Sequence, residues 1–86
     1  MIQNGNTVVI RDENGSLNFY WICDIRPNEY VLFDWFGDLR RATLADFRVI
    51  SKKRFAEGKG VSIEVYDSLP EKYLDVFEQQ ARKRNG

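Results

Sequence analysis

Hydrophobic and polar residues alternate along the first part of the chain in short runs that are typical of β-strands. Residues 7–11 are a β-branched run, and the Asp-Glu-Asn-Gly stretch that follows has the turn residues of a hairpin. Residues 17–25 alternate as a second strand. The row expected to face a core is mostly apolar: Leu17, Phe19, Trp21, Cys23 and Ile25. The row expected to face outward is mixed: Asn18, Tyr20, Ile22 and Asp24.

Three further strands are predicted to follow this hairpin. Residues 30–36 are largely apolar on both faces, which places this strand at the centre of a sheet. Residues 37–38 form a tight turn into a strand at 39–43, and residues 44–47 have the character of a single helical turn before a last short strand at 48–51. Five short strands in about fifty residues predict a small barrel, which closes its own edges.

The remainder of the chain is predicted to be a basic loop and a helix. Residues 52–60 are basic and contain glycine, as in a loop or a brief helical turn, and residues 61–66 alternate weakly as an extra strand. Ser68 and Glu71 have the spacing of a capping box, which predicts a helix over 68–84. Its apolar residues recur at three- and four-residue steps: Leu69, Tyr73, Val76, Phe77 and Ala81. We expect this stripe to pack on the barrel.

The predicted fold is therefore a single domain over residues 1–86, mainly β, with a five-stranded SH3-like barrel at about 5–51 and a C-terminal α-helix packed on it. Formal net charge is zero, so no overall field draws the chain to nucleic acid or to an anionic membrane. Cys23 is the single cysteine, and the N-terminus lacks the basic start and apolar run of a secretory signal. No stretch approaches the ~20 apolar residues that cross a bilayer. We expect an intracellular protein with no membrane partner.

The residue types that enzymes use most often are scarce. The chain has no histidine, a single cysteine and no serine in a nucleophile-elbow pattern, so the usual nucleophile and general-base arrangements are not available. The same shortage excludes a standard zinc site, and Gly58 and Gly60 lack the context of a phosphate-binding loop. Asp34 and Asp38 are a carboxylate pair, but carboxylates beside a hairpin turn usually cap the turn. We expect no enzyme, no metal and no cofactor.

Two aromatic clusters, residues 19–21 and 33–36, are the most informative feature of the sequence. With them the chain resembles a PWWP domain, one of the Tudor-related SH3-like barrels. Residues 21–25 stand where that family has the second half of its name motif, without the proline, and residues 35–38, Trp-Phe-Gly-Asp, are similar to a segment of PWWP domains in DNA methyltransferases. The turn at 44–50 and the C-terminal helix extend the resemblance over most of the chain.

The resemblance implies a ligand and a set of residues that would bind it. In that family three aromatic side chains form an open cage for a methylated lysine, with an acidic residue beside it, and ring faces attract such a cation. Trp21 and Trp35 would be two walls of the cage and Asp38 the acidic neighbour. An asparagine stands where the family places its third aromatic, so Phe19 or Tyr20 would supply the third wall.

Three functions of different classes are compatible with the sequence. The expected function is a binding module that recognises a protein segment, with a methylated lysine as the ligand that the resemblance implies. The second is a nucleic-acid-binding barrel whose phosphate contacts would come from the basic side chains: Lys52, Lys53, Arg54, Lys59, Arg40 and Arg41. The third is a small adaptor or inhibitor that blocks a larger protein, as the brevity of the chain, its completeness from Met1 and its lack of catalytic chemistry would suggest.

Overall fold

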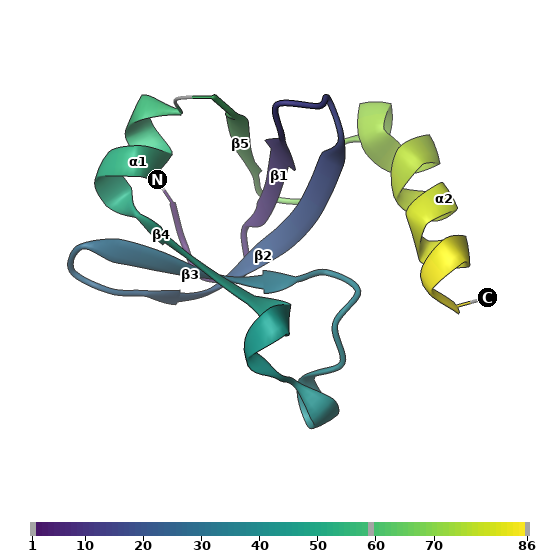
Figure 1. The fold of residues 1–86 in the computed structure, drawn as a ribbon, viewed down its shortest axis with the longest axis horizontal. Coiled ribbons are helices and arrows are strands. Elements are labelled where there is room, and N and C mark those ends of the chain that lie inside the picture. The colour runs from purple at the N-terminus through teal and green to yellow at the C-terminus, as the bar shows by residue number, and fades with distance from the viewer. Residues whose placement is uncertain (1, 59, 86) are drawn as a thin grey trace.

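The computed structural model describes residues 2–58 and 60–85, and within these residues five strands form one antiparallel sheet (Figure 1). In sequence order the strands are β1 (Thr7–Arg11), β2 (Leu17–Ile25), β3 (Glu29–Asp34), β4 (Phe47–Ser51) and β5 (Ser62–Tyr66). Their spatial order is β4-β3-β2-β1-β5, so β4 and β5 are the two edges of the sheet.

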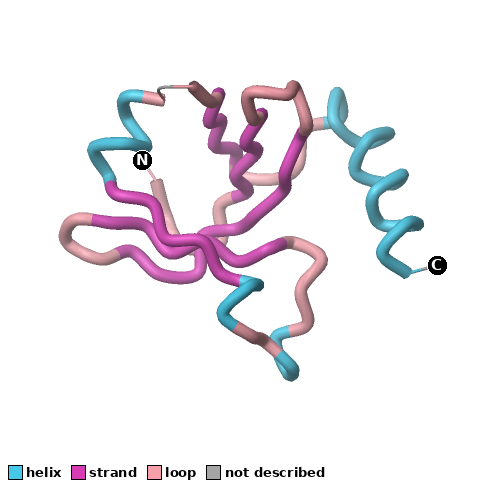
Figure 2. Tube along the Cα trace, in the orientation of Figure 1, coloured by secondary structure: helices cyan, strands magenta, loops and turns pink. Residues whose placement is uncertain are grey.

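Short helical elements connect the strands and end the chain (Figure 2). The α-helices of the described residues are α1 (Lys52–Glu57), directly after β4, and α2 (Leu74–Asn85) at the C-terminal end. The 3-10 helices are η1 (Leu39–Arg41), η2 (Leu44–Asp46) and η3 (Glu71–Tyr73). Helix α2 lies alongside the sheet, on the side away from α1 (Figure 1).

The first two strands have their predicted boundaries, whereas the strand predicted at 39–43 is wrong. The chain there forms η1, because the Asp38 carboxylate accepts a hydrogen bond from the Arg40 backbone N–H at 2.9 Å and so caps a helical turn. The fifth strand is instead the weakly alternating segment Ser62–Tyr66, which pairs with β1. The helical turn predicted at 44–47 is confirmed as η2, and β4 follows it.

The brief helical turn that was one alternative for the basic segment is present as α1, whereas the predicted start of the C-terminal helix is wrong. Residues 52–57 form a regular helix, because the Ser51 hydroxyl caps it by accepting from the Arg54 N–H at 3.1 Å and Gly58 ends it at φ 61°. The predicted capping box of Ser68 and Glu71 is wrong, since the cap position of η3 is Pro70 and has no side-chain hydrogen bond. Helix α2 begins only at residue 74, too far along the chain for Ser68 to reach its first turn.

Both faces of the sheet are buried, which the pattern of β2 did not predict. One face, here called the interior face, encloses an apolar cluster: Val8, Ile10, Ile22, Leu32 and Ile50. The other, here called the helix face, buries Val9, Phe19 and Phe33. Ile22, predicted to point outward, is therefore fully buried in the interior, because the sheet curves around one face while α2 covers part of the other.

Phe77 attaches α2 to the helix face. Its ring centroid lies 5.3 Å from that of Phe19, 5.7 Å from Trp35 and 5.0 Å from Phe36. The Gln80 side-chain amide also donates to the main-chain oxygen of Leu17 at 2.8 Å. Two residues of the predicted apolar stripe, Tyr73 and Phe77, therefore contact rings of the sheet or of the segment after β3, as expected.

A second attachment joins η3 to the edge strand β5. The Tyr73 hydroxyl donates a hydrogen bond to the Glu64 carboxylate. This bond lowers the pKa of Glu64, with further help from Tyr66 and the positive charge of Lys72, and the same bond raises the pKa of Tyr73. The residue directly before α2, Tyr73, is thus hydrogen-bonded to the Glu64 carboxylate of β5.

The Glu64 contact predicts a pH-dependent stability. Because its pKa in the folded state is below the ordinary value of 4.5, the carboxylate stabilises the fold at neutral pH, and this contribution is lost as pH falls from 4.5 through the folded-state pKa. Glu64→Gln is expected to lower the free energy of unfolding by about 1 kcal/mol at neutral pH and by progressively less under acid. Urea unfolding of both proteins, from neutral pH down through the folded-state pKa of Glu64, measures this difference in the free energy of unfolding. Glu71→Gln, on the exposed side of η3, is the control and is expected to change neutral-pH stability by less than about 0.5 kcal/mol.

Candidate functional site

The two tryptophans that the sequence proposes as cage walls lie in separate aromatic groups. The Trp21 ring is 5.5 Å from Phe33, in the middle of the sheet, and the Trp35 ring is 5.7 Å from Phe77 on α2. Both are half-buried. No aromatic contact among the described residues joins Trp21 to Trp35, so a cage between them is not preassembled by ring packing.

The remaining predicted cage residues have other roles in the fold. Phe19 is only 2% exposed, under α2, so it is not available as a third wall. Tyr20 packs on the interior face, and its hydroxyl accepts a hydrogen bond from Arg48 at 3.4 Å. Asp38 is exposed, but its carboxylate caps η1. Neighbouring residues of a strand point to opposite faces, which explains why Tyr20 and Trp21 are separated.

The basic residues proposed for nucleic acid fall into two groups at opposite ends of β4. Arg40 and Arg41 are exposed on η1, whereas Lys52, Lys53 and Arg54 belong to α1. The ammonium of Lys52 lies 5.4 Å from the centre of the Tyr30 ring. Lys59, the remaining member of the predicted set, lies outside the described residues. A single basic loop over 52–60 is therefore replaced by two positive groups with β4 between them.

Four large apolar side chains of residues 39–49, in or next to the segment that joins these two groups, are exposed: Leu39 63%, Leu44 92%, Phe47 38% and Val49 53%. We call these four residues the 39–49 surface. The part of the chain that carries η1 and η2 projects away from the sheet (Figure 1). Grouped exposed apolar side chains of this size mark interaction sites more often than isolated ones do.

Polar caps, rather than burial, hold the leucines of this surface in place. Asp38 caps η1, and the backbone N–H of Thr43 donates to the Asp46 carboxylate at 2.8 Å at the start of η2. Each 3-10 helix is thus fixed by a short-range side-chain bond that involves no leucine. Leu39 and Leu44 therefore stay at the surface of an ordered segment.

A row of packed rings joins Phe47 of the 39–49 surface to Trp21. In the strand register Phe47 is opposite Phe33, and Phe33 is opposite Trp21. The ring centroids are 5.0 Å and 5.5 Å apart, respectively. Phe33 packs closely on Gly37, where an added Cβ would lie 2.8 Å from the Phe33 ring. A buried phenylalanine thus links an exposed ring at the sheet edge to a half-buried tryptophan at its centre.

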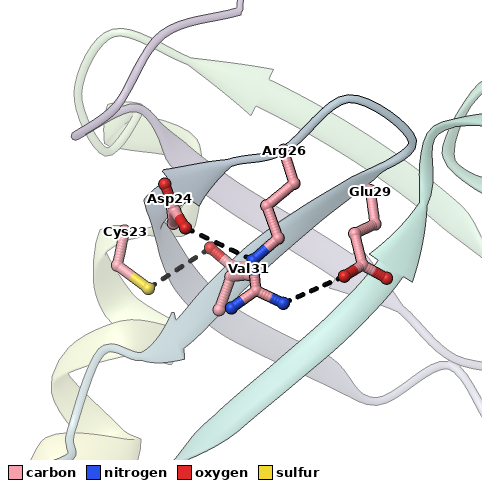
Figure 3. Close-up of polar contacts among 5 residues, drawn as sticks. All are labelled: Cys23, Asp24, Arg26, Glu29 and Val31. Atoms are coloured by element: carbon pink, nitrogen blue, oxygen red, sulfur yellow. Dashed lines mark hydrogen bonds and ion pairs between the residues drawn. The ribbon is translucent and has the colours of Figure 1, made fainter.

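Polar contacts join the residues at and beside the β2–β3 turn (Figure 3). Arg26 pairs with Asp24 at 3.3 Å and with Glu29 at 3.0 Å across the β2–β3 turn. The Cys23 thiol donates to the main-chain oxygen of Val31 at 3.4 Å, and burial raises its pKa. A thiol with a raised pKa is a poor nucleophile at neutral pH. Cys23 is therefore structural here.

The residues predicted from the sequence include Trp21 but not the 39–49 surface. The sequence pattern predicted a strand at Leu39 and a helical turn before a strand at Leu44 and Phe47. Large apolar side chains at such positions are normally buried. The signal that distinguishes them is the pair of caps, Asp38 and the Thr43–Asp46 box, which favour 3-10 turns over a continuous strand.

Within the part of the chain that the structure describes, no helix is both long and apolar enough to span a bilayer. Three or more histidine, cysteine or carboxylate side chains do not come together as a metal site in those residues. No protein-family model, curated protein or solved structure matches this chain. The functional assignment therefore depends on the geometry of the chain itself.

Proposed function

We propose that this chain is a non-catalytic binding module that recognises a segment of another protein through the 39–49 surface and the adjoining ring of Trp21. The observation that carries the proposal is the 92% exposure of Leu44 beside the 63% exposure of Leu39. Burial of an exposed leucine gains about 1.5–3 kcal/mol, so covering this surface would supply much of the free energy of binding.

The SH3-like barrel of the PWWP kind belongs to the same proposal. It is supported by the single five-stranded antiparallel sheet, by the apolar cluster that the sheet encloses and by the helix that follows. In such a barrel, side chains of the strands and of the loops between them contact the ligand. A methylated lysine is the less supported ligand, because Trp21 and Trp35 contact different phenylalanines and Asp38 is engaged as a cap.

A protein segment fits this surface better than nucleic acid does. Nucleic acid is bound mainly by cations on phosphates and by aromatic rings on bases. The 39–49 surface has two leucines and a valine beside its one exposed phenylalanine. Aliphatic side chains of this kind gain most from apolar side chains of a partner, so the basic residues around the surface have a supporting role.

The proposal predicts a strong effect of Leu44→Asp. Peptides are first selected from a random ten-residue display library on the immobilised full chain, and their affinity is then measured by titration calorimetry. Leu44→Asp is expected to weaken binding at least tenfold, because it places a charge in the apolar contact, and to change stability by less than about 0.5 kcal/mol.

The matched control is Leu74→Asp, since Leu74 is also an exposed leucine, at 42%, but lies at the start of α2. We expect this variant to bind the selected peptides as the unmodified chain does. Equal binding by the Leu44→Asp variant, or a failure of the library to yield any peptide, would contradict the proposed function.

A further inference from the structure

Among residues 2–58 and 60–85, no strand pairs with the outer side of β4. β4 is an edge of the sheet there, and its partner is β3. Lys52 N–H donates to the Asn28 oxygen at 2.9 Å, in the same register that pairs Ile50 with Tyr30. Antiparallel strands alternate between bonded and non-bonded pairs. Ile50 and every second residue before it therefore bond to β3, and Phe47, Val49 and Ser51 direct their main-chain groups away from it.

Local structure uses only part of this outer row. Phe47 N–H donates to the Leu44 oxygen at the end of η2, and the Ser51 oxygen lies at the start of α1. The groups that remain are the Phe47 oxygen, the Val49 N–H and oxygen, and the Ser51 N–H. None of these four has a partner among the hydrogen bonds outside the sheet that join the described residues. They are spaced as one side of a strand ladder.

The side chains of β4 give this edge little protection. Edge strands usually avoid pairing with other chains by means of proline, a bulge or charged side chains. β4 has no proline and pairs with β3 without a register shift, and its one charged side chain, Arg48, bonds to the Tyr20 hydroxyl on the interior face. The exposed residues of β4 are Phe47, Val49 and Ser51. The apolar side chains and the unpaired main-chain groups thus belong to the same residues.

The charges around β4 indicate which kind of segment would bind beside it. Residues 39–54 contain six basic side chains and one acidic side chain, Asp46, which is held in the cap of η2. None of these basic side chains takes part in the ion pairs of the described residues. Pairing β4 with β4 of a second copy would bring two such positive segments together, and like charges across a strand pair are destabilising. A segment with acidic residues is attracted instead.

We propose that β4 is extended by a strand from a protein partner, a segment with alternating apolar residues at its centre and acidic residues on both sides. This inference rests on the proposed function and gives it a binding mode: main-chain hydrogen bonds supply affinity, Phe47 and Val49 contact alternate side chains, and the positive groups on η1 and α1 attract the acidic ends. Leu39 and Leu44 lie beyond one end of the added strand, and a ten-residue peptide is longer than β4, so its end would contact them.

Ser51 offers a substitution that removes one hydrogen-bond donor of this edge without straining the fold. Its φ is −62°, close to the value that proline requires, and the preceding residue is extended. Ser51→Pro deletes the outward N–H and the cap of α1, whereas Ser51→Ala deletes the cap alone. Ser51→Pro is expected to bind the display-selected peptides at least tenfold more weakly than Ser51→Ala, by calorimetry on the full chain.

A second measurement needs no substitution. Amide hydrogen exchange by NMR is expected to slow at least tenfold at Val49 and Ser51 when a selected peptide is added. Their exchange would stay unchanged if the peptide bound through side chains alone. The selected peptides are also expected to combine acidic residues with alternating apolar residues.

The outcomes separate this inference from the proposed function. Peptides that are lost with Leu44→Asp but bind the two Ser51 variants equally, with no slowed exchange, would overturn strand addition and leave the protein-binding function in place. Selected peptides without acidic residues would contradict the charge argument. If the chain formed a dimer and Ser51→Pro abolished it, β4 would pair with β4 of a second copy, and the inference of a partner strand would be wrong. No selected peptide at all would overturn both proposals.

Discussion

Phe33→Ala is expected to lower the free energy of unfolding by about 4 kcal/mol. Phe33 is 1% exposed and lies between the rings of Trp21 and Phe47, with Gly37 packed against it. Removal of its ring would leave a cavity that neither neighbouring strand can close, because the sheet hydrogen bonds fix the distance between strands. The loss would be a large part of the stability of a domain this small.

Urea unfolding followed by tryptophan fluorescence measures this effect, since Trp21 reports on the same contact. Phe47→Ala is the matched control, because it truncates the same side chain in the same row of rings at a position that is 38% exposed. We expect it to cost less than half as much as Phe33→Ala. Equal losses for the two variants would show that Phe33 is not the centre of this row.

Phe77→Ala is expected to cost about 3 kcal/mol and to release α2 from the sheet. Phe77 contacts the rings of Phe19, Trp35 and Phe36, and Gln80 and Arg84 supply further contacts of α2. Arg84 pairs with Asp34 at a distance of 3.7 Å, and pairs near the surface contribute little. Phe77 is therefore expected to supply most of the free energy that holds the helix on the sheet.

Amide exchange distinguishes release of the helix from unfolding of the whole domain. In the Phe77→Ala variant the amides of α2 are expected to exchange rapidly while those of β1 and β2 remain protected. Glu78→Ala, which removes only an exposed pair with Arg82 at 3.9 Å, is the control and is expected to change stability by less than about 0.5 kcal/mol. Rapid exchange throughout the sheet would mean that α2 and the sheet unfold as one unit.

The features that could be predicted from the sequence depend on residues close together in the chain. The β-branched run of β1, the turn residues after it and the alternation of β2 determine the first hairpin, because strand period and turn geometry are local properties. The three- and four-residue spacing of Tyr73 and Phe77 likewise predicted that a helix would pack through these rings.

The candidate surface depended on interactions that a pattern does not encode. The alternation of β2 separates its two faces but does not show whether other segments cover one face or both. Here α2 buries Phe19 on one face, and the curved sheet buries Ile22 on the other. A segment rich in leucine, such as 39–44, reads as buried structure unless its caps are recognised.

By itself, the sequence determined which segments form most of the strands and helices, because this follows from residue types and their local spacing. It also determined that no histidine is available for catalysis or metal binding. Only the tertiary structure decided which apolar side chains remain uncovered. It left Leu39, Leu44, Phe47 and Val49 exposed because β4 is an edge strand and η1 and η2 project from the sheet beside it. Exposure of a side chain depends on which distant segments pack over it, and that is a property of the whole fold.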